Sequence, residues 1–170
     1  KKAAVMILSF AVEGYDKTFF NVLKETTAAD IVVVAAAGND GENIEKNKVY
    51  PAAFRLPNLI TVAATTSENQ LWEGSNYGKK YVHIAAPGAK ILGPWIDGTW
   101  DTGNGTSFSA PIVAGAAALM RSANPKLKAP QIVQILQKTV IKLDSLSDKV
   151  ASGGMLDIQR AVECSIDEKL

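Results

Sequence analysis

Four short apolar runs lie in the first ninety residues, and each has the length of a β-strand. They cover residues 3–10, 31–37, 59–65 and 81–86. The runs lack the polar alternation of a half-exposed strand, which is typical of strands buried on both faces. Between the first two, residues 16–29 carry apolar side chains at helical spacing, namely Phe19, Phe20, Leu23 and Ala28. Strands separated by a helix and long loops predict an α/β fold, a parallel sheet with helices on both faces.

The second half of the chain is rich in helical patterns. Three segments have helical spacing: residues 107–122, 129–140 and 156–168. The first is apolar on all sides, which predicts a helix buried in the centre of the domain. The second is amphipathic, with Ile132, Ile135 and Leu136 facing inward, and the third is expected to be capped by Asp157. Residues 91–104 are interrupted by glycine and proline, so they predict a hairpin or an irregular loop.

The composition narrows the classes of function. The 170 residues carry a net charge of +1, so charge alone predicts no nucleic-acid partner and no acidic membrane surface. The longest apolar runs are far too short to span a bilayer, and no signal peptide is expected. The single cysteine, Cys164, cannot form an internal disulfide, and we expect it to pack within the last helix. The compartment stays undetermined.

A serine at the start of the most apolar helix is the strongest candidate for chemistry. It is Ser107, in the segment Gly105-Thr106-Ser107-Phe108-Ser109-Ala110-Pro111. A serine hydroxyl becomes a nucleophile when a base takes its proton and hydrogen-bond donors stabilise the oxyanion. The N-terminus of a helix supplies unpaired N–H groups and about half a positive charge. Taken alone, Ser107 fits a helix cap as well as a nucleophile.

Several segments together resemble one protein family. The serine segment and the helix after it resemble the serine motif of the subtilisin-like serine proteases (subtilases). The other matching segments follow in the family's order: Ala36-Ala37-Gly38-Asn39-Asp40-Gly41, Tyr50-Pro51-Ala52, Ile60-Thr61-Val62-Ala63-Ala64, Ser75-Asn76-Tyr77-Gly78, Ile84-Ala85-Ala86-Pro87-Gly88 and Gly154-Met155-Leu156-Asp157. Several independent motifs in order are a specific signal, whereas each alone is weak. The resemblance covers almost the whole chain and implies a subtilisin-like fold for the predicted sheet.

The resemblance implies roles by position. Ser107 would be the nucleophile, and the side-chain amide of Asn39 would donate to the oxyanion together with the Ser107 N–H. The segment Ser9-Phe10-Ala11 would pair with the backbone of a polypeptide substrate. The segment Ala36-Ala37-Gly38 would form the floor of the pocket for the side chain before the scissile bond. From the residues alone, Asn39 also fits a turn and Ser9 the plain end of a strand.

The resemblance also implies that part of the catalytic machinery lies outside this sequence. In the family, the aspartate and histidine of the triad precede the region that matches the first strand. Residues 1–170 are therefore expected to be the C-terminal part of a single catalytic domain, with the family's N-terminal strands absent. Asp101 and His83, the only histidine, lie at the wrong places in the family's order to complete a triad. Alone, the chain is expected to lack ordinary protease activity.

Exposure of the strand Ala3–Phe10 is a physical consequence of that interpretation. Without the preceding strands, this edge of the sheet and one face of the Ser107 helix would contact solvent, and an apolar sheet edge invites pairing. We therefore expect aggregation, a dimer through Ala3–Phe10, or a bound companion segment from the missing N-terminal half.

Two questions stay open at the level of the sequence. The alternative to an endopeptidase acting through Ser107 is a catalytically incomplete fragment or pseudoenzyme that binds peptides or has a structural role. No cofactor is indicated. Residues 52–59 resemble a calcium-binding region of the family, where backbone oxygens would be the main ligands, but no acidic cluster supports calcium there.

Overall fold

The chain forms a central six-stranded sheet. The structure is a computed structural model, and it describes residues 3–167. The strands follow the order β1 (Val5–Leu8), β3 (Val32–Ala36), β5 (Leu59–Thr65), β6 (Ile84–Pro87), β10 (Gly154–Met155) and β9 (Ile141–Lys142). Neighbouring strands run parallel except for β10 and β9. The predicted α/β fold is therefore confirmed.

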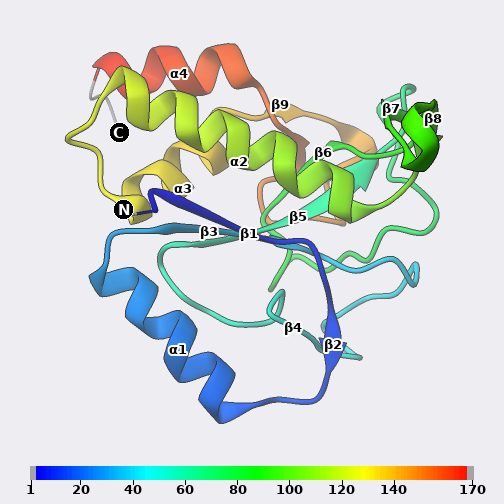
Figure 1. Cartoon of the computed structure of the whole chain (residues 1–170), viewed down its shortest axis with the longest axis horizontal. Helices are drawn as coiled ribbons and strands as arrows, with labels where there is room; N and C mark the ends of the chain where they lie inside the picture. The colour runs from blue at the N-terminus through cyan, green and yellow to red at the C-terminus, as the bar shows by residue number, and fades with distance from the viewer. Residues whose placement is uncertain (1–2, 168–170) are drawn as a thin grey trace.

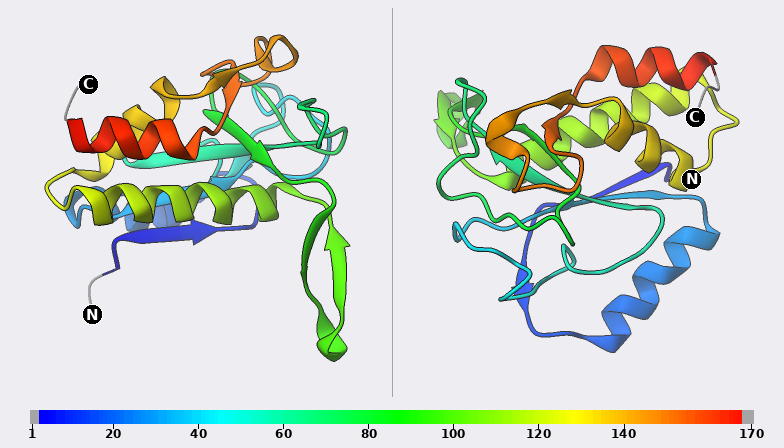
Figure 2. Two further views of the ribbon diagram at one scale, coloured as in Figure 1. Left: turned by 90° about the horizontal axis from the view of Figure 1, so that it is seen from above. Right: turned by 180° about the vertical axis from the view of Figure 1, so that it is seen from behind.

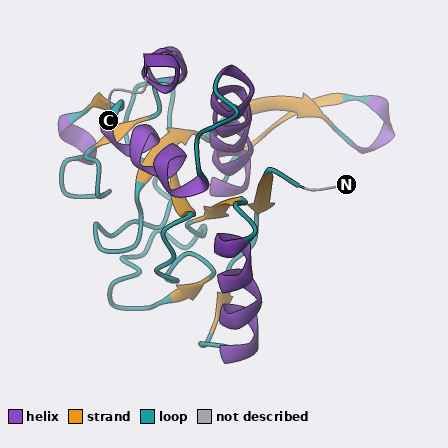
Figure 3. Ribbon diagram, turned by 90° about the vertical axis from the view of Figure 1, so that its left-hand side faces the viewer, coloured by secondary structure: helices purple, strands orange, loops and turns teal. Residues whose placement is uncertain are grey.

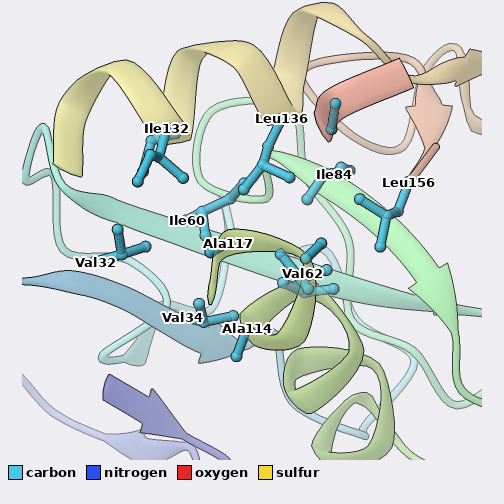
Figure 4. Close-up of a cluster of buried hydrophobic side chains, with 14 of the residues drawn as sticks. Val32, Val34, Ile60, Val62, Ile84, Ala114, Ala117, Ile132, Leu136 and Leu156 are labelled. Carbon is cyan, nitrogen blue, oxygen red and sulfur yellow. The ribbon is translucent and has the colours of Figure 1, made fainter. Parts of the chain in front are cut away.

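Helices cover both faces of this sheet (Figure 1). On one face lie α2 (Thr106–Ala123), α3 (Ala129–Lys138) and α4 (Ile158–Asp167), and on the other lies α1 (Lys17–Ala28). The same division is visible from the side in Figure 3. In the close-up of Figure 4, valine and isoleucine side chains of β3, β5 and β6 meet Ala114 and Ala117 of α2 and Leu136 of α3. Small alanine side chains let α2 pack closely on the sheet, so the sheet fixes the position of the helix that carries Ser107.

The helix α1 begins where the sequence predicts it. Asp16 caps it by accepting a hydrogen bond from the Phe19 N–H at 2.8 Å. Leu23 is buried in the second core cluster, as expected. The prediction for Ala28 is wrong, because Ala28 is exposed and Thr26 is buried instead. Thr26 tolerates burial because its hydroxyl donates to the Leu23 carbonyl.

Two predicted strands differ from the observed ones. β1 is shorter than residues 3–10 and lies at the edge of the sheet, so its Ile7 is 45% exposed rather than buried on both faces. β6 starts at Ile84 rather than at residue 81. Tyr81 and Val82 instead form a turn in which both N–H groups donate to the Gly78 carbonyl. An apolar run predicts burial, but it does not show which of its residues turn before the strand begins.

The predicted helices of the second half are present, with one correction. α3 buries Ile132, Ile135 and Leu136, and Asp157 accepts the Arg160 N–H at the start of α4. Cys164 packs partly buried against the core, and residue 168 of the predicted last helix lies outside the described residues. α2 is not buried on all sides. Its exposed positions form one stripe along the helix: Pro111, Gly115, Ala118, Leu119, Ser122 and Ala123.

Two small antiparallel pairs complete the fold. β2 (Val12–Glu13) pairs with β4 (Val49–Tyr50), and β7 (Ile91–Pro94) pairs with β8 (Trp100–Gly103). The β7–β8 hairpin projects away from the body of the domain in the left panel of Figure 2. Short 3-10 helices span Ile96–Gly98 at its tip and Asp144–Leu146 before β10. The expected hairpin over residues 91–104 is confirmed. No helix among residues 3–167 is long and apolar enough to cross a membrane.

Asp30 joins the end of α2 to the start of β3. Its carboxylate accepts hydrogen bonds from Arg121 Nη1 at 2.9 Å and from the Ala129 N–H at 2.7 Å. Arg121 also donates to the Asp30 carbonyl, and Lys128 lies 3.8 Å from the carboxylate. Asp30 has a left-handed backbone, with φ of 58°. These contacts hold α1, α2, α3 and β3 together at the end of the sheet opposite to Asn39.

Candidate active site

The carboxyl ends of β3 and β6 meet the start of α2. Asn39 follows β3 by three residues and is exposed, whereas Gly38 before it is buried. Gly88 follows β6, and its carbonyl accepts the Gly105 N–H at 2.8 Å. Because ligands bind at the carboxyl ends of strands in open parallel sheets, this edge is the expected place for a site.

Asn76 shapes the loop that carries Asn39. Its side-chain oxygen accepts the N–H groups of Asp40 and Glu42 at 3.1 and 2.9 Å. Its side-chain nitrogen donates to the Ala37 carbonyl and to the Asp40 carboxylate. Gly38 has φ of +102°, and a Cβ there would collide with this side-chain nitrogen. Only glycine therefore lets the loop pass over Asn76.

Thr106 orients the amide of Asn39. The Thr106 N–H donates to Asn39 Oδ1 at 2.8 Å, and the Thr106 hydroxyl donates to the same atom at 2.9 Å. That hydroxyl in turn accepts the Gly38 N–H at 3.1 Å. A backbone N–H can only donate, so the atom facing it is the oxygen. The Nδ2–H groups of Asn39 therefore point away from Thr106.

Asn39 and Ser107 flank the same point in space. A Cβ built on Gly105 would lie 3.0 Å from Ser107 Oγ and 3.3 Å from Asn39 Nδ2. Glycine at position 105 keeps this point free, and its backbone (φ 153°, ψ 155°) turns the chain into α2. Ser107 is the second residue of the helix, and its N–H has no acceptor in the described part of the chain. The arrangement brings the Ser107 hydroxyl and the Asn39 amide to one small volume at the start of α2.

Pro111 links the helix to Ser9. Proline has no N–H, so the Ser107 carbonyl loses the donor that an α-helix normally supplies from four residues later. The Ser9 hydroxyl donates to this carbonyl at 3.3 Å. The segment after β1 is thereby held against the first turn of α2.

The remaining predicted substrate-binding residues divide into two groups. The Ala11 methyl lies 3.6 Å from a Cβ built on Gly38, so the segment after β1 also adjoins the Asn39 loop. The ring of Phe10 is 47% exposed and stacks on Phe19. Ala36 and Ala37 are buried in separate core clusters on opposite faces of the sheet. The side chain of Ala36 packs on the face that α2 covers, and that of Ala37 packs on the opposite face.

Comparison with known protein families agrees with this geometry. The profile of the Subtilase family matches residues 1–161. The chain belongs to the subtilase family. Subtilisin-like protease 3 of Plasmodium falciparum is 32% identical over 98% of this chain and 24% of its own length. Subtilisin of Bacillus pumilus is 36% identical over 84% of this chain and 50% of its own length.

Solved structures give the same fold. A protease of Pseudoalteromonas arctica superimposes with a TM-score of 0.85 at 28% identity, over 96% of this chain and 51% of that one. A chain in the structure of the subtilase cytotoxin SubAB assembly gives 0.83 at 29% identity, over 97% of this chain and 59% of that one. The subtilisin-like fold is therefore confirmed. This subtilase chain spans a quarter to a half of the two curated relatives and somewhat more than half of these two solved chains.

His83 and Asp101 lie apart from Ser107 in this subtilase. His83 precedes β6, four residues before Pro87 and about 13 Å from it along the strand. Its Nδ1 accepts the Thr61 N–H at 2.8 Å, and burial, with a smaller effect of Arg55, lowers the pKa of His83 to about 4. Asp101 is exposed on β8 and accepts the N–H of its neighbour Thr102.

The loop that resembles a calcium region does not fit calcium. The carbonyls of Ala52 and Leu56 already accept hydrogen bonds from Thr61 and Leu59. The depression beside the loop is lined by Arg55 and two lysines, with no carboxylate in its lining. Among residues 3–167 no group of three or more histidine, cysteine or acidic side chains could hold a metal ion. A divalent cation would therefore meet repulsion here.

Sequence reasoning missed the roles of Thr106 and Asn76. Both lie inside segments that resemble subtilase motifs, but their contacts reach 67 and 36 residues along the chain, to Asn39 and Asp40. A sequence pattern carries no signal for such pairs. Only the order of the two motifs indicated that they meet.

Proposed function

We propose that this chain carries the nucleophile and the oxyanion donors of a serine endopeptidase. Subtilases are serine proteases, and the relatives described above are proteases by name. The supporting observation is the convergence of Ser107 Oγ and Asn39 Nδ2 on the space beside Gly105. The substrate is a polypeptide, cleaved through an acyl-enzyme on Ser107. Residues 1–170 form the C-terminal part of the catalytic domain, and a preceding segment supplies the aspartate and the histidine.

Each group in the site has a distinct part in this reaction. A base from the preceding segment takes the Ser107 proton as Oγ bonds to the carbonyl carbon of the substrate. The carbonyl oxygen becomes an oxyanion and accepts hydrogen bonds from Asn39 Nδ2 and from the Ser107 N–H. The positive end of the α2 dipole favours the same charge. The protonated base then gives its proton to the leaving amine, and water releases the acyl group by the reverse steps.

The segment Ser9-Phe10-Ala11 is the proposed wall for the substrate backbone. Its position between α2 and the Asn39 loop supports this, because the Ser9 hydroxyl contacts the Ser107 carbonyl and Ala11 adjoins Gly38. The backbone of Ala36-Ala37-Gly38, rather than its side chains, would border the pocket for the residue before the scissile bond. Extended substrate backbones pair with such exposed segments through main-chain hydrogen bonds.

The exposed stripe of α2 and the edge strand β1 are the proposed contact for the preceding segment. Leu119 is 53% exposed on α2, and Ile7 is 45% exposed on β1. α2 lies next to β1, so the two surfaces belong to neighbouring elements (Figure 2, left). In the competing proposal, a second copy of the chain covers these surfaces in a dimer through Ala3–Phe10. Sedimentation that shows a monomer with a cooperative melt would argue against both.

Labelling with a fluorophosphonate tests the proposal on the longer protein that includes the preceding segment. We expect Ser107 to be labelled, and Ser107→Ala to abolish labelling without loss of the fold. Asn39→Ala should slow labelling by about 100- to 1,000-fold, an amount taken from subtilisin itself rather than from this structure. A folded protein that binds peptides yet leaves Ser107 unlabelled would instead be the peptide-binding pseudoenzyme.

A further inference from the structure

A second site lies at the opposite end of the sheet from Ser107. It is a shallow depression of about 490 Å³ beside the amino ends of β5 and β6. Three loops contribute to it: Arg55 comes from the loop before β5, Lys79 and Lys80 from the loop before β6, and Ala151 from the loop before β10. His83 forms part of its wall, and two apolar residues complete the lining.

The cations of this depression have no acidic partner in its lining. The three ion pairs among the described residues involve Arg121, Lys128 and Lys149 as cations, so none includes a residue of the depression. Glu45 contacts this group of residues, because its carboxylate accepts the Lys80 backbone N–H at 3.0 Å. The Lys80 ammonium lies 5.5 Å from the Tyr81 ring centre. Three cations against one carboxylate leave a net positive charge.

His83 adds a directed donor to this charge. Because its Nδ1 accepts the Thr61 N–H, the neutral ring carries its proton on Nε2. Nε2 has no partner among the described residues. Among the described residues, Arg121 Nε is the only buried side-chain nitrogen or oxygen atom without a hydrogen-bond partner. His83 Nε2 is therefore not buried and reaches solvent. His83 lines the depression, so this space lies beside the ring.

We propose that the depression binds a tetrahedral oxyanion of the phosphate or sulfate class. The His83 Nε2–H and the side chains of Arg55 and Lys79 donate to its oxygens, and Lys80 adds charge. Such charge-assisted hydrogen bonds are the strong ones in proteins. The bound anion bridges the loop before β5 and the loop before β6, so it stabilises the fold without touching Ser107. The positive surroundings also account for part of the low pKa of His83, which an anion would raise.

Thermal melting of the chain, at micromolar protein concentration and with added inorganic phosphate, tests the proposed anion site. Ionic strength is held constant with potassium chloride, and sulfate and acetate are run as parallel arms. We expect Tm to rise by about 2–4 °C and to saturate in phosphate and in sulfate. Arg55→Gln with Lys79→Gln should remove the rise. Lys17→Gln with Lys24→Gln, the same loss of charge at exposed positions of α1, should keep it.

The NMR signal of His83 gives a second measurement. His83 is the only histidine of the chain, so a 13C-labelled imidazole reports this site alone. We expect a saturable shift with phosphate and a higher pKa. Three results would overturn the proposal: a shift that grows linearly with phosphate, an unchanged response in the double variant of the depression, or acetate that binds as tightly as phosphate.

Discussion

The stability of the chain should fall between pH 6.5 and pH 4 because of one side chain. The native protein keeps His83 neutral, since burial and then Arg55 lower its pKa from 6.5 to about 4. The unfolded chain takes up a proton at the ordinary pKa. Over this interval the unfolded state binds more protons than the native state, so its free energy falls relative to the native one as pH decreases. Above pH 6.5 the full stability is present, and below about pH 4 no further loss arises from His83.

The magnitude follows from the same numbers. Each pH unit between the two pKa values costs about 1.4 kcal/mol, so the free energy of unfolding should drop by about 3 kcal/mol. That is a large part of the 5–15 kcal/mol typical of a domain. With a urea dependence of about 2 kcal/mol per molar, the midpoint of unfolding should move by about 1.5 M. Urea titrations between pH 7 and pH 4.5, in buffers without phosphate or sulfate, measure this.

The matched control is His83→Asn. The asparagine side-chain oxygen can accept the Thr61 N–H in place of Nδ1, but it does not titrate. We expect the variant to lose the part of the pH dependence of its unfolding free energy, between pH 5 and 6.5, that comes from His83. Any slope that remains comes from the carboxylates. If wild type and His83→Asn have the same slope in this range, the reasoning about His83 is wrong.

Four further substitutions test other parts of the structure. Gly38→Ala should lower the free energy of unfolding in urea by about 1–3 kcal/mol, because φ is +102° and Asn76 occupies the space of the methyl group. Gly115→Ala has open space at its Cβ, so it should raise that free energy by about 0.5–1 kcal/mol. Asn76→Ala removes the side-chain hydrogen bonds that shape the Asn39 loop, so labelling of Ser107 in the longer protein should slow at least tenfold. An unchanged labelling rate would show that the loop keeps its conformation without these hydrogen bonds. Asp30→Asn should cost about 1.5–3 kcal/mol at pH 7. Burial raises the pKa of Asp30, but the Ala129 N–H and Arg121 outweigh it and lower that pKa below 3.8. The stabilisation therefore decreases as pH falls below about 4, and urea melts should show a smaller difference between wild type and variant at pH 3 than at pH 7.

The buried strands were the most predictable part of the fold. β5 spans residues 59–65 as expected, and β3 lies within residues 31–37, because both are covered on two faces and their apolar runs have no other explanation. The serine helix was predicted to be buried all round, but one stripe that includes Leu119 is exposed. An apolar sequence shows that a surface requires cover. It does not show whether the same chain provides that cover.

The site was predictable in its main residues and not in their supports. Ser107 and Asn39 stand in motifs whose order in the sequence already pointed to a shared site. The supports act across the fold: Thr106 orients the amide of Asn39, and Pro111 frees a carbonyl for Ser9. The His83 depression has no motif at all, since its cations come from loops that only the folded sheet brings together.

The contacts of Asp30 help to fix the position of the helix that carries Ser107. Asp30 and Arg121 hold the C-terminal end of α2 near the start of β3, and Thr106 and Asn39 hold its N-terminal end near the end of β3. The helix therefore cannot slide along its axis. Thr106 and Arg121 are 15 residues apart, which is about 23 Å along the helix. Loss of the Asp30 contacts would leave only the Thr106 end of α2 held in this way. We therefore expect substitution of Asp30 to change the reactivity of Ser107, although Asp30 contacts the opposite end of the helix.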